Sequence, residues 1–103
     1  MSLPKPLPFV LTQFHKLNAR KLGVEVKRSS VKGKKLDVFK DGIKVASIGA
    51  DGYWDYGLFK EAENNGVFPK GYAAKRRRLY RLRHAGEQNK KGTPGYYAWH
   101  ILW

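Results

Sequence analysis

Cysteine is absent from the 103 residues, and acidic residues are few. Without thiols the chain can form neither disulfides nor thiolate metal sites, so packing alone must stabilise its fold. No apolar run approaches the ~20 residues that a bilayer-spanning helix needs. The start, residues 1–8, has prolines where a signal peptide needs a helical apolar run. We therefore expect no membrane span and no secretion.

Positive charge dominates what is present. Lys and Arg number 21 against 8 Asp and Glu, which gives a net charge of +13. Hydrophobic residues make up 42% and aromatic residues 14%, too much for a disordered basic tail. We expect one folded domain with a modest core. A charge balance of this kind attracts polyanions, of which nucleic acid is the commonest.

The pattern of apolar residues predicts an α+β fold. Residues 1–11 are expected to form an extended Pro-rich arm, and residues 12–103 a single basic domain. Alternating apolar residues predict a three-stranded antiparallel meander over about residues 24–49. Three or four short helices would pack it, over 12–22, 55–64, 72–85 and from 93 onward. We expect the aromatic C-terminus to dock on the sheet or on a neighbouring subunit.

Asp41-Gly42 separates two apolar runs and is a strong signal for a two-residue hairpin turn. Such a turn would pair Val38 with Val45 and Phe39 with Lys44. On this register one face carries Leu36, Val38, Ile43 and Val45, and the other carries Phe39, Ala46 and Ile48. In the first predicted helix, Phe14, Leu17 and Leu22 are expected to point inward.

The densest basic run lies at residues 75–84. On a helical wheel Tyr72, Leu79 and Leu82 form an apolar stripe, and Arg77, Arg78 and Arg81 fall opposite it. The planar guanidinium fork donates two hydrogen bonds to neighbouring phosphate oxygens and stays charged. Arg76 and Arg83 border the stripe, so for these two we also consider pairing with the chain's own carboxylates, Asp51, Asp55 or Glu61.

Residues 70–91 hold nine Lys and Arg side chains against Glu87 alone. No internal salt-bridge network can neutralise such an excess, and ordinary solvated helix faces mix both signs. We therefore predict a phosphate-binding surface. Its residues would be Lys75, Arg76, Arg77, Arg78, Arg81, Arg83, Lys90 and Lys91.

A second basic patch is predicted at Lys32, Lys34 and Lys35, in the turn of the first hairpin, with Lys40 and Lys44 nearby. Lysines there also protect strand edges from aggregation, and that alternative stays equally open. The tyrosines and tryptophans can stack on unpaired bases. Core packing is the favoured role for most of them.

Enzyme signatures are weak. The sequence has no Gly-rich phosphate loop, no paired zinc spacing and no nucleophile elbow. His15, His84 and His100 are scattered along the sequence, and we interpret them as structural residues. A metal-dependent nuclease would need clustered carboxylates, and the candidates are Asp51, Asp55, Glu61 and Glu63. We expect a protein that is not an enzyme and that needs no metal or cofactor; a nuclease ranks third among the functions considered.

Four segments carry a resemblance to known proteins. They are Gly52-Tyr53-Trp54-Asp55-Tyr56, residues 77–84 ending in Arg83-His84, residues 93–98 beginning Thr93-Pro94-Gly95, and Ile101-Leu102-Trp103. They resemble a family of short basic proteins of large DNA viruses and other aquatic viruses, with a Gly-Tyr-x-Asp-Tyr segment, an Arg-rich stretch ending in Arg-His and a terminal Leu-Leu-Trp. The resemblance covers about residues 36–103.

The resemblance implies a viral protein located in the virion or inside the infected host cell. With the charge pattern, it leads us to expect a protein that binds nucleic acid, DNA in the first instance, largely independently of sequence. The alternative is a minor capsid or assembly protein that binds other viral structural proteins, with the terminal aromatics as anchors. The extended arm fits that alternative, and self-association into a homo-oligomer stays open.

Overall fold

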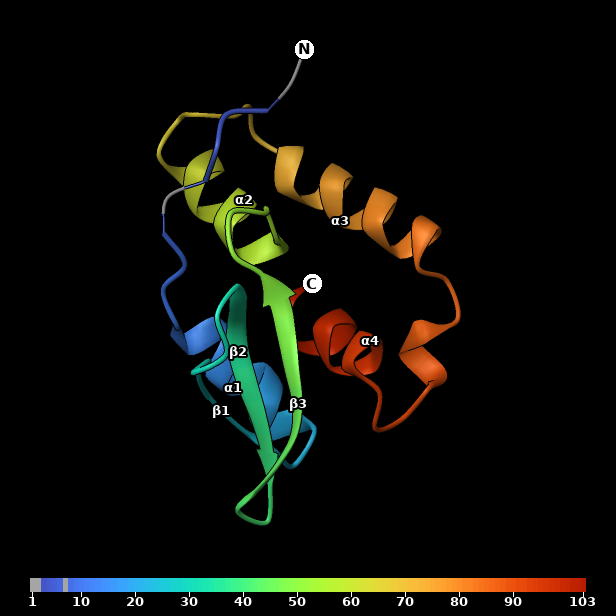
Figure 1. The fold of residues 1–103 in the computed structure, drawn as a ribbon. Coiled ribbons are helices and arrows are strands. Elements are labelled where there is room, and N and C mark those ends of the chain that lie inside the picture. Colours follow the sequence, from blue (N-terminus) through green and yellow to red (C-terminus); the bar gives the residue numbers. More distant parts are fainter. Residues whose placement is uncertain (1–2, 7) are drawn as a thin grey trace.

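Three antiparallel strands form one open sheet in the order β1-β2-β3; α1 and α4 lie against it, and α2 and α3 lie beyond one end of the strands (Figure 1). The computed structural model describes residues 3–6 and 8–103, and its α+β architecture confirms the predicted fold class. The strands are β1 (Glu25–Arg28), β2 (Lys34–Lys40) and β3 (Ile43–Ala50). The helices are α1 (Gln13–Lys21), α2 (Tyr56–Asn64), α3 (Tyr72–Arg83), the 3₁₀ turn η1 (Glu87–Asn89), α4 (Pro94–Tyr97) and the π-helical turn η2 (Ala98–Leu102).

The helices begin where local chemistry places them. Thr12, Asp55 and Thr93 stand just before α1, α2 and α4 with extended backbones. The Asp55 carboxylate accepts a hydrogen bond from the Leu58 amide at 3.0 Å, and the Thr93 hydroxyl accepts one from the Tyr96 amide at 3.2 Å. These contacts satisfy amides that the first helical turn leaves unpaired. The predicted helix starts at these three residues are confirmed.

The β2–β3 hairpin confirms the predicted turn and corrects the predicted register. Asp41 and Gly42 both have positive φ, 52° and 78°. Phe39 pairs with Lys44 as predicted, but a β-bulge between Val38 and Phe39 pairs Val38 with Ala46 in place of Val45. An extra residue in one strand turns the side chains beyond it to the other face of the sheet.

The bulge therefore decides which side chains of β3 enter the core. Ala46 and Ile48 are buried on the same side as Leu36 and Val38, while Ile43 and Val45 are exposed. The predicted grouping of Val45 with Leu36, and of Ala46 and Ile48 with Phe39, was wrong for this reason. Ile43 lies on the turn side of the bulge, keeps its pairing with Lys40 and is exposed.

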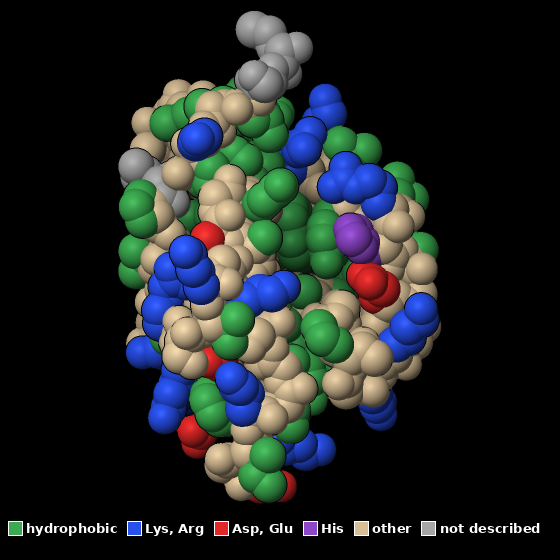
Figure 2. All heavy atoms as spheres, viewed as in Figure 1, with side chains coloured by type: hydrophobic (Ala, Val, Ile, Leu, Met, Phe, Trp, Pro, Cys, Tyr) green, Lys and Arg blue, Asp and Glu red, His purple; other side chains and the backbone are tan. Residues whose placement is uncertain are grey.

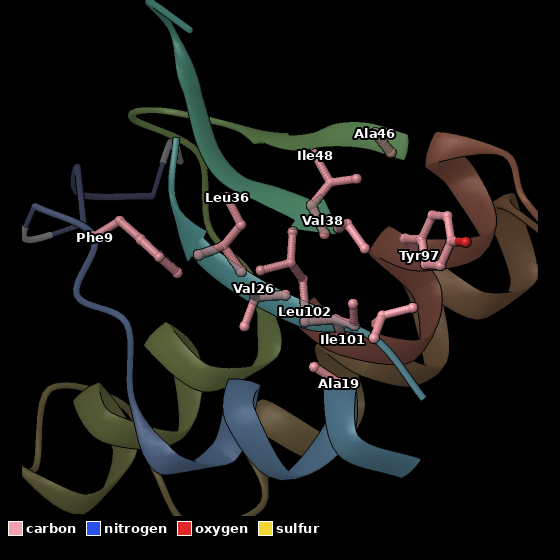
Figure 3. Packing of buried hydrophobic residues seen from close by; sticks show 11 residues of the cluster. Phe9, Ala19, Val26, Leu36, Val38, Ala46, Ile48, Tyr97, Ile101 and Leu102 are labelled. Carbon is pink, nitrogen blue, oxygen red and sulfur yellow. The ribbon is translucent and has the colours of Figure 1, made fainter. Parts of the chain in front are cut away.

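The core lies between the sheet, α1 and the C-terminal α4–η2 segment (Figure 3). Ile101 and Leu102 are almost completely buried there, so the predicted docking of the C-terminus on the sheet is confirmed. In α1, His15 and Ala19 are buried, whereas Leu17 is exposed, contrary to prediction. The chain before α1 also contributes, because Phe9 is buried in the cluster and the Trp54 indole donates a hydrogen bond to the Pro4 carbonyl. Residues 1, 2 and 7 of the expected arm lie outside the described residues.

Candidate nucleic-acid interface

Helix α3 lies along one side of the molecule and packs chiefly against α2 (Figure 1). Its buried side chains are Ala73 and Tyr80, and Leu82 is 69% exposed. The predicted apolar stripe through Leu82 was therefore wrong. Tyr80 turns inward because its ring stacks on Trp103, with centroids 4.2 Å apart and planes 4° apart. A stacked aromatic pair buries more apolar area than a leucine could in its place.

Two arginines at the border of the inner face of α3 lie over aromatic rings of α2. The Arg76 guanidinium lies over the Phe59 ring, 5.4 Å from its centroid, and the Arg77 guanidinium lies over the Tyr56 ring at 4.0 Å. Both side chains are half-buried. The prediction that Arg77 lies fully on the solvent face was wrong, because the surface of α2 that receives α3 is aromatic and attracts guanidinium groups.

Arg77, Arg78 and Arg81 come together around a shallow surface groove, which Ala74 and Leu82 also line. Arg81 lies on the turn after Arg77, with its guanidinium 5.3 Å from the Trp99 ring centroid. Arg81 also donates a hydrogen bond to the main-chain oxygen of Trp103, at 3.4 Å. We call the surface formed by these five α3 residues the arginine groove.

No Asp or Glu side chain among the described residues forms an ion pair with an arginine of the groove. Asp51 pairs with Arg28 at 3.3 Å, Asp55 with Lys35 at 2.8 Å, and Glu63 with Lys60 at 3.1 Å. The expected alternative, in which Arg76 and Arg83 pair with Asp51, Asp55 or Glu61, was wrong because Asp51 and Asp55 are taken by other cations and Glu61 forms no ion pair with either arginine.

Burial and like charge both act on the arginines of the groove. The pKa of Arg81 is lowered, first because its guanidinium is partly removed from water and then because Arg77 carries the same charge close by; Tyr56 opposes the shift. Like charges one helical turn apart repel each other. An external anion in the groove would relieve this repulsion.

The other predicted residues of the basic surface stand apart from the groove. Lys75 and Arg83 are exposed on α3 but do not line it. Lys90 and Lys91 are exposed in the turn between η1 and α4. The structure thus gathers three of the eight predicted residues into one surface feature and leaves the rest dispersed.

One of the three lysines predicted for the second basic patch is buried in the structure. Lys32 and Lys34 are exposed, but Lys35 is only 2% exposed and cannot reach an external partner. Its ammonium group donates to the Asp55 carboxylate at 2.8 Å and to the Tyr53 carbonyl at 2.7 Å. A buried cation is stable only with such partners. The sequence signal for burial was weak, because Asp55 lies twenty positions away.

Asp37 fixes the turn that presents Lys32 and Lys34. Its buried carboxylate accepts hydrogen bonds from the Ser29 hydroxyl at 2.6 Å, the Ser47 hydroxyl at 2.7 Å and the Ser30 amide at 3.2 Å. Burial by itself would raise the pKa of Asp37, but these hydrogen bonds, with a smaller contribution from Lys44, lower it to about 2. The carboxylate is therefore charged at neutral pH and holds the β1–β2 turn against β3.

Most aromatic side chains are packed, as predicted. Trp54 stacks on Phe59 with ring centroids 4.7 Å apart, and Trp99 is 8% exposed. All aromatic residues fall within the described part of the chain, and Tyr53, at 70%, is the only exposed one. A row of free rings on which successive bases could stack is therefore not present on this protein.

On the face shown in Figure 2, Lys and Arg side chains are spread widely, with few acidic groups between them. Among the described residues, no group of three or more His, Asp or Glu side chains is placed to hold a metal ion. Nor does the described part of the chain contain a helix with the length and apolar character needed to cross a bilayer.

Comparisons of this chain with protein-family models, with curated proteins and with solved structures find no match. The resemblance to basic viral proteins is neither supported nor contradicted by them and stays an expectation.

Proposed function

We propose that this protein binds nucleic acid through its phosphate backbone, without catalysis and largely independently of base sequence. DNA is the first candidate, in the viral setting that the sequence resemblance implies. The observation that carries the proposal is the arginine groove: Arg77, Arg78 and Arg81 line one surface feature, and no Asp or Glu side chain of the described residues pairs with them.

The chemistry of the groove suits a phosphodiester. Guanidinium groups donate paired hydrogen bonds to phosphate oxygens, and Arg keeps its charge at any physiological pH. Each neutralised phosphate releases condensed counterions, which supplies binding free energy that is independent of sequence. Dispersed cations such as Lys75, Arg83, Lys32 and Lys34 are exposed and would add to the attraction of the backbone.

The alternative, an assembly protein that binds capsid components through its terminal aromatics, has less support. Trp99 is buried against the rest of the chain, and Trp103 stacks on Tyr80. Anchor residues of a protein interface need to be free to enter a pocket on the partner. These rings are already engaged inside the domain.

The test is binding of a fluorescent random-sequence duplex measured across a salt series. Three groove contacts alone predict that log affinity falls with log salt with a slope of about −3. Arg78→Ala should weaken binding to all sequences alike and reduce that slope by about one. Lys16→Ala is the matched control, because Lys16 is exposed on α1, away from the groove. A flat salt response of the native protein would contradict the proposal.

A further inference from the structure

Two aromatic rings from outside α3 lie beneath two arginines of the groove. Tyr56, at the start of α2, lies under Arg77 at 4.0 Å, and Trp99, in η2, lies under Arg81 at 5.3 Å. Tyr56 and Trp99 are separated by 43 positions in the sequence and reach the groove from different elements. Tertiary packing therefore fixes where these guanidinium groups lie.

We propose that Tyr56 and Trp99 are positioning residues that hold Arg77 and Arg81 as a preformed site for the phosphate backbone, so that the protein recognises phosphate and not bases. This inference rests on the proposed function and specifies the ligand chemistry of the same groove. Tyr56 and Trp99 act through the arginines and make no contact with the ligand.

The two rings hold the arginine side chains in place before a phosphate binds. A free arginine loses much side-chain freedom when it binds a phosphate, and this loss weakens binding. A guanidinium held over a ring by cation–π attraction has already lost that freedom in the unbound protein. Arg81 is held a second time, by its hydrogen bond to the main-chain oxygen of Trp103.

The same geometry excludes stacking of bases at this site. The Arg77 guanidinium covers the face of Tyr56 at 4.0 Å, so a base cannot occupy that face while the contact is in place. The Tyr56 ring also contacts Phe14, with centroids 5.7 Å apart. Trp99 is buried, and Trp103 stacks on Tyr80. The groove therefore offers a ligand the edges of its guanidinium groups, whose N–H groups donate hydrogen bonds to phosphate oxygens.

The first experiment replaces the ring and keeps every charge. Tyr56→Leu should weaken binding of a random-sequence DNA duplex about 5-fold, the loss expected for one exposed cation–π contact, with the salt slope unchanged because no charge is removed. Tyr56→Phe keeps the ring and should bind as the native protein does. Tyr53→Leu is the control, because Tyr53 is the exposed tyrosine three positions earlier and has no cation–π contact with an arginine of the groove.

A second variant, Arg77→Lys, removes the same cation–π contact from the other side. It leaves the packed Tyr56 ring in place, so it tests the contact even if Tyr56→Leu folds poorly. Lysine keeps the charge but loses the planar fork and its stacking, so we expect a similar loss of affinity at an unchanged salt slope. Native affinity of a folded Tyr56→Leu variant would overturn the inference, while binding by the native protein would leave the proposed function standing.

The second experiment separates phosphate from base. A single strand of abasic deoxyribose phosphates should compete for the protein as well as a base-bearing strand of equal length. Much weaker competition by the abasic strand would show that bases are contacted and would overturn the inference. Absence of any nucleic-acid binding by the native protein would instead remove the proposed function itself.

Discussion

His15 is buried in the core of this basic protein with one of its ring nitrogens unpaired. Its Nδ1 accepts a hydrogen bond from the Thr12 amide at 3.1 Å, and its Nε2 is buried without a hydrogen-bond partner. Burial lowers the pKa of His15; Asp55 opposes the shift and Lys35 adds to it. Protonation would also replace the acceptor at Nδ1 with a donor facing the Thr12 amide.

Stability should therefore fall as the solution is acidified. The unfolded chain takes up a proton on His15 near pH 6.5, while the folded chain resists it to lower pH. Below pH 6.5 the contribution of His15 to the free energy of unfolding should drop as the pH falls, by at most about 1.4 kcal/mol per pH unit for one proton. His15→Asn keeps an acceptor for the Thr12 amide without titrating, so urea unfolding of this variant should lose that dependence. An equal pH slope in both proteins would contradict the assignment.

At the scale of elements, the Lys35–Asp55 ion pair joins β2 to the start of α2. Both side chains are almost fully buried, and Asp55 also caps α2 through the Leu58 amide. Because α3 packs on α2, this pair sets where the arginine groove lies relative to the sheet. The ion pair thus connects the core to the candidate site.

Breaking one partner should cost far more than removing both. Lys35→Met leaves the Asp55 carboxylate buried without its cation, and we expect a loss of about 3–5 kcal/mol in the free energy of unfolding. Asp55→Asn keeps an oxygen for the cap but removes the charge, so the double variant should recover much of the stability. Denaturant unfolding of the two single variants and the double variant measures the coupling. Simple additivity would mean that the pair contributes no interaction of its own.

Local signals in the sequence predicted where helices, strands and turns lie. The features that these signals did not predict depend on contacts between elements that are far apart in the sequence. Thr12, Asp55 and Thr93 mark helix starts through their own side chains, and Asp41-Gly42 fixes its turn through backbone preference. The bulge between Val38 and Phe39 shifts the register of β3, and periodicity alone does not show such a shift, so it gave the wrong face. The position of Arg77 depends on Tyr56, twenty-one positions earlier, and no pattern on the α3 wheel could show that contact.

For the whole molecule, a net charge of +13 acts on stability and on binding in opposite directions. Positive groups spread over the surface repel one another in the free folded protein, and dissolved ions screen that repulsion. The same ions compete with the protein for phosphates. Raising NaCl from about 0.02 to about 0.3 M should therefore raise Tm while it weakens binding of a DNA duplex.

Polyanions should also raise Tm, and at far lower concentration than NaCl. They bind the folded chain and so shift the unfolding equilibrium by mass action. Calorimetry with inorganic polyphosphate at low salt should give a higher Tm for the native protein. The gain should be smaller for the variant with Arg77, Arg78 and Arg81 replaced by Ala, which lacks the groove cations but keeps the dispersed ones. An equal gain in both proteins would mean that the total charge attracts the polyanion and the groove does not concentrate it.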